Sequence, residues 1–293
     1  MKLLIVSNAP LIYKDKFSYA YGPYVNELII LKKFSDEISF CCPVWENDNG
    51  LLISRIPFDF VENFELIDLN LKTIKAVFLS IFYSSYNMVA LFRAMKNADH
   101  IHLRCPGNIG LLGCFVQILF PNKIKTAKYA GNWDPKSKQP WTYKLQKYIL
   151  ENTFLTKNMQ VLVYGDWKSQ SKNIKPFFTA TYSESEKEIV QKTDLNSVIE
   201  FVFVGSLVVG KNPMYAIQLV ERLIKKGNNV NLNLYGDGIE KTILEDYIKK
   251  NQLSEFVFLY GNQNQEIIKK AYQKSHFVIL PSKSEGWPKA IAE

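Results

Sequence analysis

The second half of the chain alternates short β-rich runs with segments whose apolar residues recur at helical spacing. Strands and helices that alternate strictly form a parallel sheet covered by helices on both faces. Asn212 and Pro213 are placed to begin the first of these helices, and Gly227 to end it. The predicted strands are 198–204, 230–235, 256–260 and 276–280, and the predicted helices are 213–226, 240–251 and 265–274.

The first half repeats the alternation less regularly, with a looser region after residue 42 and a turn signal at 47–50. The polar stretch 191–197 is the predicted domain boundary. We therefore expect an α/β protein with two doubly wound, Rossmann-like parallel-sheet domains, residues 1–190 and 198–293, that face each other across a cleft. The predicted strands of the first domain are 3–6, 38–42, 100–103, 124–130 and 161–164, and its predicted helices are 23–34, 71–98, 109–120 and 141–156.

The last residues also carry information. Pro288 predicts a helix start, but the sequence stops at Glu293, six residues into that element. Helices average about 11–12 residues. We therefore expect the second domain to be incomplete in this chain.

The net charge limits the classes of partner, and the number and spacing of the cysteines indicate the compartment. Lys and Arg number 36 against 28 Asp and Glu, and a pI near 9.1 suits an anionic partner: nucleic acid, a membrane surface or a phosphorylated small molecule. No dense Lys/Arg cluster with interleaved aromatic residues stands out in the sequence, so nucleic acid is not expected. The four cysteines form no CxxC pair, which argues against a zinc cage or a disulfide framework and for a reducing, cytoplasmic compartment.

The most apolar stretch, 76–92, contains three serines and an asparagine. It falls short of the about 18 apolar residues that indicate a membrane-spanning helix. We interpret it as a core helix of a globular domain. The alternative is a helix that lies on a membrane, flanked by Lys72, Lys75 and Arg93, which would make the protein peripheral at the inner membrane face.

Ligands of doubly wound sheets bind beyond the carboxyl ends of the strands, so the loops at these ends are the candidate sites. In the loop 204–213, Gly205 and Gly210 permit close backbone approach, and the helix that follows offers free N–H groups to a phosphate. Lys211 adds a positive charge at the same place. The loop is a predicted phosphate site, with an ordinary turn and a surface lysine as the alternative.

Two further strand ends carry candidate residues. The turn at Tyr235-Gly236-Asp237-Gly238 suits a tight backbone, and Asp237 is placed to cap the next helix, although a plain turn explains it equally well. The segment 281–293 places Glu285 in a loop and Glu293 about two turns into the predicted helix, separated by seven residues. Two carboxylates can each accept hydrogen bonds from vicinal hydroxyls, which sugars present.

The segment 281–293 resembles the E-x7-E motif of retaining glycosyltransferases of the GT-B fold, especially glycosyltransferase family 4. The Glu-Gly-aromatic-Pro pattern of that family stands here as Glu285-Gly286-Trp287-Pro288. The loop at 204–211, the turn at 236–238 and the turn at 259–261 follow in the family's order. The resemblance is strong over about 200–293 and weak over the first domain.

The resemblance implies a nucleotide-sugar donor held mainly by the second domain. Glu285 would contact the transferred sugar, with the amides of Gly286 and Trp287, and Glu293 would hold the ribose. Lys211 would neutralise the diphosphate. Many members have an arginine where this chain has Ser206, and Lys283, Lys289 or Arg104 are candidates to compensate. The donor-binding candidates are Gly22, Gly205, Ser206, Lys211, Gly236, Asp237, Gly261, Asn262, Glu285, Gly286, Trp287, Pro288, Lys289 and Glu293.

In the first domain, members have a glycine-rich loop after the first strand, and the corresponding stretch here is 19–24, with Gly22. His102 and Arg104 end another strand and can reach the sugar from the acceptor side. The alternative for His102 is a hydrogen-bonded structural histidine. Asn132 and Asp134 follow a strand and are candidates for the acceptor pocket, or belong to a plain loop.

The leading hypothesis is therefore a retaining glycosyltransferase that moves a sugar from a nucleotide-diphosphate sugar to a glycan or lipid-linked glycan, in bacterial surface polysaccharide synthesis such as capsule or lipopolysaccharide. Lys211, Glu285 and His102 are its catalytic candidates. The sequence contains no Asp-x-Asp and no Gly-x-Gly-x-x-Gly, so neither a metal ion nor a nicotinamide cofactor is expected. The alternatives are a nucleotide-sugar epimerase of the same fold and a catalytically weak sugar-nucleotide binding protein.

Overall fold

The computed structural model describes residues 1–69, 74–167, 170–179, 194–195, 197–283, 285 and 287–292. The chain divides into two compact units, Met1–Phe178 and Thr179–Glu293. Much of the predicted boundary segment, 191–193 and 196, lies outside the described residues. In the part of the chain that the structure describes, no helix is long and apolar enough to span a membrane.

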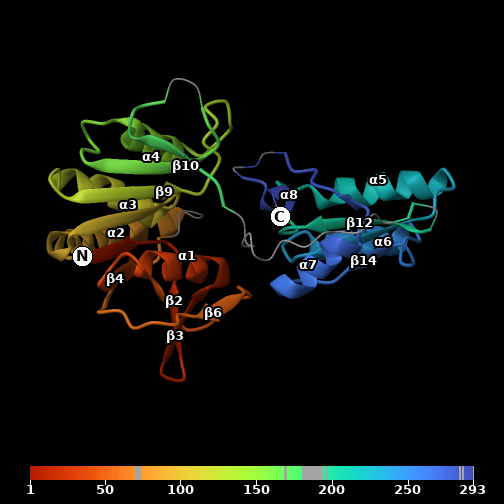
Figure 1. The fold of residues 1–293 in the computed structure, drawn as a ribbon, viewed down its shortest axis with the longest axis horizontal. Coiled ribbons are helices and arrows are strands. Elements are labelled where there is room, and N and C mark those ends of the chain that lie inside the picture. Colours follow the sequence, from red (N-terminus) through yellow and green to blue (C-terminus); the bar gives the residue numbers. More distant parts are fainter. Residues whose placement is uncertain are drawn as a thin grey trace. The chain divides into compact units, whose positions relative to one another are not determined.

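The N-terminal unit is built on a seven-stranded parallel sheet (Figure 1). Its helix α1 (Gly22–Lys32) packs on one face, and the other face carries α2 (Ile74–Asn97), α3 (Asn108–Val116), the short 3-10 helix Gln117–Leu119 and α4 (Trp141–Glu151). The strand order is β11-β10-β9-β8-β1-β4-β7: Ile174–Phe177, Met159–Tyr164, Ile124–Tyr129, His100–Cys105, Lys2–Val6, Glu37–Cys42 and Asn63–Glu65.

Alternation along β1 divides the core into two layers. Leu4 and Val6 pack among the helices α2 to α4, whereas Leu3 and Ile5 pack toward α1. All four cysteines are buried and free, as expected for a chain without a disulfide framework. Glycine serves packing in α3, because a Cβ on Gly110 would lie 2.8 Å from the carbonyl oxygen of Arg104.

A small mixed sheet was not predicted. It has the order β5-β2-β3-β6, or Val44–Trp45, Leu11–Lys14, Phe17–Tyr21 and Ile53–Arg55. Strands β2 and β3 form an antiparallel hairpin whose turn residues Asp15 and Lys16 both have positive φ, without the glycine that usually signals such a turn.

The hairpin corrects the expectation of a glycine-rich loop at 19–24. Tyr19 and Tyr21 belong to β3, and Gly22 is the first residue of α1. The N–H of Gly22 donates to the carbonyl oxygen of Leu52 at 2.8 Å. That amide is therefore already bonded within the protein.

The C-terminal unit follows the predicted alternation to within a few residues. Its parallel sheet has the order β14-β13-β12-β15, or Val257–Leu259, Val230–Tyr235, Ile199–Val204 and Phe277–Val278. Its helices are α5 (Pro213–Lys225), α6 (Lys241–Lys250), α7 (Gln265–Lys274) and α8 (Lys289–Ala292). The positive φ of Gly227 confirms the predicted end of α5.

The side chains of Asn212 and Asp237 do not cap the helices that follow them. Asn212 precedes α5 in the left-handed conformation and makes no side-chain cap; its side-chain amide donates instead to the carbonyl oxygen of Pro281 at 3.4 Å. Asp237 does not cap α6, because its carboxylate accepts from the N–H of Gly238 at 2.7 Å. Both side chains thus stabilise the loops rather than the helix starts.

Candidate functional site

The loops that follow the four strands of the C-terminal sheet meet at its carboxyl edge. The N–H of Gly236, after β13, donates to the carbonyl oxygen of Gly261, after β14, at 2.8 Å. The N–H of Lys283, after β15, donates to the carbonyl oxygen of Gly210, after β12, at 2.9 Å. The structure therefore brings together the loop segments that the sequence singled out separately.

Close backbone approach explains one of the glycines in these loops. Gly236 has φ +141°, and a Cβ there would lie 2.0 Å from the carbonyl oxygen of Gly205. Beside this contact the rings of Tyr235 and Tyr260 stack with centroids 4.8 Å apart. The turns after β12, β13 and β14 consequently form one packed unit.

Lys211 and Glu285 form the central ion pair of this edge. The Nζ of Lys211 donates to Oε1 of Glu285 at 2.6 Å and to Oε2 at 2.8 Å. The side chains are 33% and 18% exposed, so both are accessible to a ligand. The two residues predicted to act on the donor, 74 positions apart in sequence, are in direct contact.

Hydrogen bonds of Trp287 hold the loop that carries Glu285 on its C-terminal side. The indole N–H of Trp287 donates to the carbonyl oxygen of Thr179 at 2.5 Å, and the N–H of Lys289 donates to the carbonyl oxygen of Trp287 at 3.0 Å. Pro288 precedes α8, as predicted from its place in the sequence. Gly286 and Glu293 lie outside the described residues.

The other predicted donor residues line the same edge. Ser206, Asp237 and Asn262 are exposed at the loop surfaces, and Gly261 has φ +67°. Asp237 also lies 3.6 Å from Nζ of Lys241, a distance between exposed charges that contributes little stability.

The carboxyl edge of the N-terminal sheet has a second charged cluster. Arg104 on β8 and Lys128 on β9 are register partners, and Glu27 of α1 accepts hydrogen bonds from both. Burial opposes ionisation of Glu27, but the two cations outweigh it and lower the pKa of its carboxyl group. Arg104 is thus engaged within its own unit.

Aromatic rings complete this cluster. The guanidinium of Arg104 lies 4.1 Å from the ring centre of Tyr24, and the ammonium of Lys128 lies 4.8 Å from that of Phe177. Sequence analysis missed Glu27 and Lys128. A lysine within the otherwise buried end of the strand Ile124–Tyr129 was the available signal, because a lysine is almost never fully buried without a partner.

His102 is a buried histidine rather than an open one. It is 5% exposed, and its Nδ1 lies 2.8 Å from the hydroxyl of Thr126, which also lies 2.9 Å from Nε2 of His100. Burial, together with the nearby Arg104, lowers the pKa of His102 to about 3. The geometry matches the structural alternative left open by the sequence and leaves the catalytic role unsupported.

Asn132 and Asp134 shape the loop after β9. The side-chain oxygen of Asn132 accepts from the N–H of Asp134 at 2.8 Å, and that of Asp134 accepts from the N–H of Lys136 at 2.8 Å. The indole of Trp133 is buried between them and packs edge-on against Tyr129. Both polar side chains therefore hold a turn, and an acceptor role stays a prediction.

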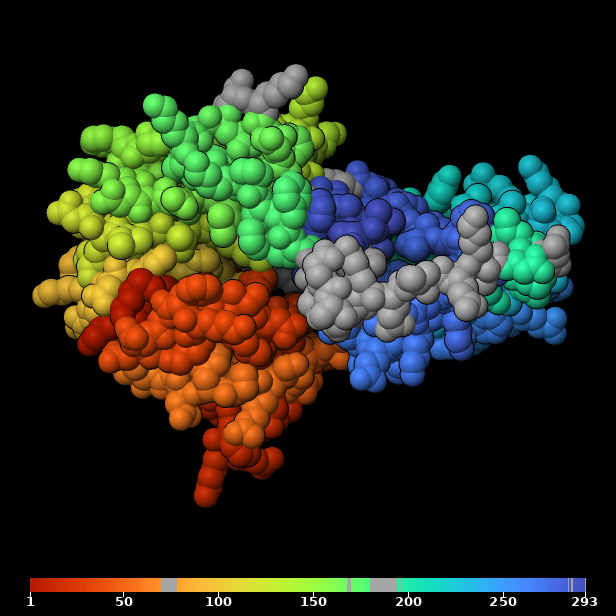
Figure 2. All heavy atoms as spheres, viewed as in Figure 1, coloured from red at the N-terminus to blue at the C-terminus, as the bar shows by residue number. Residues whose placement is uncertain are grey.

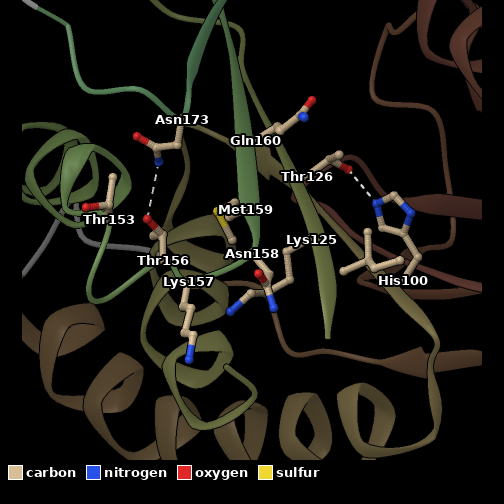
Figure 3. A pocket seen from close by; sticks show the side chains of 11 residues that line it. His100, Lys125, Thr126, Thr153, Thr156, Lys157, Asn158, Met159, Gln160 and Asn173 are labelled. Carbon is tan, nitrogen blue, oxygen red and sulfur yellow. Dashed lines mark hydrogen bonds between the residues drawn. The ribbon is translucent and has the colours of Figure 1, made fainter. Parts of the chain in front are cut away.

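A separate hollow of about 690 Å³ opens at the amino ends of β8, β9 and β10 (Figure 3). His100, Thr126 and Lys125 line it, and the ammonium of Lys125 donates to the side-chain oxygen of Gln117 at 2.8 Å. Burial lowers the pKa of Lys125 to about 8. Because parallel sheets bind ligands at their carboxyl ends, this opposite edge is not a candidate for the main site.

Comparison with known proteins adds independent information. Residues 185–293 match the family described as "Glycosyl transferases group 1". The whole chain aligns at 25% identity with Protein CapJ of Staphylococcus aureus and covers 76% of it.

Three solved structures show the same fold. HepE of Anabaena, in complex with UDP and glucose, matches with a TM-score of 0.65 at 13% identity, over 99% of this chain and 77% of that chain. The lipopolysaccharide outer core galactosyltransferase WaaB matches with 0.61 at 16%, over 100% and 77%. WaaG, a glycosyltransferase involved in lipopolysaccharide biosynthesis, matches with 0.61 at 11%, over 99% and 77%. This chain spans about three quarters of the length of these relatives.

Proposed function

We propose that this chain, which has the GT-B fold, is a group 1 glycosyltransferase that transfers a sugar, with retention, from a nucleotide-diphosphate sugar to a glycan or lipid-linked glycan. The observation that carries the proposal is the Lys211–Glu285 pair at the carboxyl edge of the C-terminal sheet. A cation and a carboxylate side by side suit a ligand that presents both a diphosphate and sugar hydroxyls.

The donor lies along the converging loops. Lys211 and the positive dipole end of α5 bind the diphosphate, because a helix start and an ammonium both favour negative charge. Glu285 accepts from hydroxyls of the transferred sugar. Glu293 takes the ribose, and the turn at Gly261 and Asn262 borders the base. HepE, whose complex contains UDP and glucose, supports a donor of this class.

In the reaction the bond between the anomeric carbon and the diphosphate oxygen breaks through an oxocarbenium-like state. Lys211 stabilises the charge that develops on the leaving oxygen. The acceptor hydroxyl attacks from the same face and gives its proton to the departing phosphate, so no protein nucleophile is required. The proposal includes no metal ion.

Glu285 has two tasks in this scheme. In this structure it neutralises Lys211 through both carboxylate oxygens. A diphosphate carries more negative charge than one carboxylate and competes for the lysine, which leaves Glu285 available to the sugar. The pair thereby holds the ammonium of Lys211 in place at the end of the loop 204–213.

The acceptor belongs to bacterial surface polysaccharide synthesis on the cytoplasmic side of the membrane. WaaB and WaaG, described as lipopolysaccharide enzymes, support this assignment. A polymer such as a capsule is the same class of product.

The test of the catalytic pair is transfer by Lys211→Ala and Glu285→Ala, measured as release of nucleoside diphosphate and as glycosidic product. Each variant should lose at least about tenfold of the rate, equivalent to roughly 1.4 kcal/mol of transition-state stabilisation. Lys225→Ala is the matched control, because Lys225 pairs with Glu221 on α5 and is 71% exposed. Wild-type turnover in both site variants would refute the assignment, and donor isomerisation without glycoside would identify an epimerase.

The donor is identified by thermal stability with UDP, GDP, ADP and their sugars, each with and without EDTA. A ligand at about 100 times its Kd adds about 2.7 kcal/mol. A shift with one nucleotide that persists in EDTA is expected. A shift abolished by EDTA would contradict metal independence, and no shift with any nucleotide would contradict the donor site.

A further inference from the structure

Helix α2 leaves an apolar stripe uncovered on the N-terminal unit. One side of the helix packs into the core through Leu91, Ala94 and Met95. The opposite side exposes six large apolar residues, two of them more than 70% exposed: Phe78, Ile81, Phe82, Tyr86, Val89 and Phe92. Figure 2 shows atoms of this stretch, orange to yellow on the bar, at the surface of the unit.

Basic residues continue the same stripe. At 3.6 residues per turn, Arg93 and Lys96 lie on the side of Phe82 and Val89, and both are exposed. Helix α4, which packs against α3 in the same layer, repeats the pattern with exposed Trp141, Lys144 and Tyr148 at spacings of three and four. Large apolar side chains and cations therefore lie together on the outer sides of α2 and α4.

Acidic residues are almost missing from this layer. The helices α2, α3 and α4 contain five Lys and Arg and a single acidic residue, Glu151. The asymmetry extends to the whole chain: residues 1–178 hold 22 Lys and Arg against 14 Asp and Glu, whereas residues 179–293 hold 14 of each. The net charge of +8 thus comes entirely from the N-terminal unit.

We infer that the helix layer α2–α3–α4 lies on an anionic lipid surface, with the exposed Phe, Ile, Val, Trp and Tyr side chains of α2 and α4 at the boundary between headgroups and acyl chains. An interfacial helix combines a large apolar face with Lys and Arg that attract anionic headgroups. The exposed rings and the charge sign of this layer meet both requirements. A second copy of this chain would provide the apolar surface but not the negative charge, because two such layers would bring like charges together.

The inference goes beyond the proposed reaction and can be tested without it. Vesicle binding involves neither donor nor acceptor, so its failure would leave the Lys211–Glu285 site untouched. If both hold, the protein works on acceptors presented at a membrane surface.

The experiment is flotation of the full chain with vesicles of phosphatidylcholine containing about 30% phosphatidylglycerol, against phosphatidylcholine alone. Binding should need the anionic lipid and weaken in about 1 M salt, where the Debye length is about 3 Å. The double variant Phe78→Ser/Phe82→Ser should bind at least about tenfold more weakly. Because both side chains are already exposed, it should keep the wild-type melting temperature.

Ile243→Ser on α6 is the matched control, an exposed apolar residue of the other unit, and should bind as wild type. The double variant Arg93→Gln/Lys96→Gln tests the cations separately. It should reduce the difference in binding between vesicles with and without anionic lipid. Equal binding to both vesicle types, or undiminished binding of both double variants, would overturn the inference. Self-association that Phe78→Ser/Phe82→Ser abolishes, with no vesicle binding, would instead assign the surface to a second copy.

Discussion

Glu27→Gln should destabilise the N-terminal unit more than any ordinary surface substitution. Glu27 is 25% exposed and lies between Arg104, 20% exposed, and Lys128, 6% exposed. The change keeps the size of the side chain and removes its charge, which leaves two adjacent cations facing one another across β8 and β9. We expect the unit to lose stability because the charge of Lys128 becomes uncompensated in a buried position.

The magnitude follows from the burial of the partners. Removing one member of a buried ion pair costs about 3–5 kcal/mol, and the partial exposure of Glu27 places this case near 3 kcal/mol. For a unit of this size the melting temperature should fall by roughly 6–12 °C. Four of the five tryptophans, at positions 45, 133, 141 and 167, belong to this unit, so their fluorescence reports its unfolding.

A double-mutant cycle with Lys128→Met isolates the interaction. Glu27→Gln/Lys128→Met should be less destabilised than the sum of the single changes by at least about 1 kcal/mol, because it removes the buried charge together with its partner. The free energy of unfolding should also depend on pH in acid, because Glu27 binds a proton there. The lowered pKa of Glu27 means that its contribution is present above the unfolded pKa of about 4.3 and is lost as pH falls through the folded pKa. Additive single changes, or a Glu27→Gln variant within about 0.5 kcal/mol of wild type, would refute the reasoning.

Two further predictions concern Gly236 and His102. Gly236→Ala should cost about 2–4 kcal/mol and weaken nucleotide binding, because the added Cβ would lie 2.0 Å from the Gly205 carbonyl oxygen; Gly210→Ala, where a Cβ meets nothing within 4 Å, is the control, and equal melting temperatures would contradict the argument. His102 stays neutral in the folded unit while the unfolded chain binds a proton near pH 6.5, so wild-type stability should fall by up to about 1.4 kcal/mol per pH unit as pH drops from 6.5 toward 4. His102→Gln should flatten that slope in acid unfolding curves, and an unchanged slope would show that His102 is not the group responsible.

Local sequence patterns were sufficient to predict elements whose structure depends mainly on their own residues. The strands and helices of the C-terminal unit were predicted to within a few residues, except that the expected strand at 276–280 is reduced to Phe277–Val278. The antiparallel hairpin β2–β3 was missed because its turn, Asp15-Lys16, has none of the usual glycine signal. The expected loop at Gly22 consequently became the end of a strand and the first turn of α1.

The two side chains considered as helix caps form their hydrogen bonds elsewhere. Asn212 and Asp237 stand next to helix starts, yet each forms its hydrogen bond within the loops at the carboxyl edge. Such a side chain can form its hydrogen bond either with the helix end or with a neighbouring loop, and the groups that pack beside it decide which. Spacing alone does not contain that information.

The sequence by itself determined that this chain forms parallel sheets with glycine and lysine at the strand ends, because hydrophobic periodicity and turn residues act over a few positions. Only the tertiary structure decided that Lys211 meets Glu285, that Glu27 of α1 joins Arg104 and Lys128, and that His102 is buried against Thr126. These contacts join residues 24 to 101 positions apart. Their charges and hydrogen bonds come within reach only after the strands have taken their order in the sheet, since register and order depend on the packing of the whole unit.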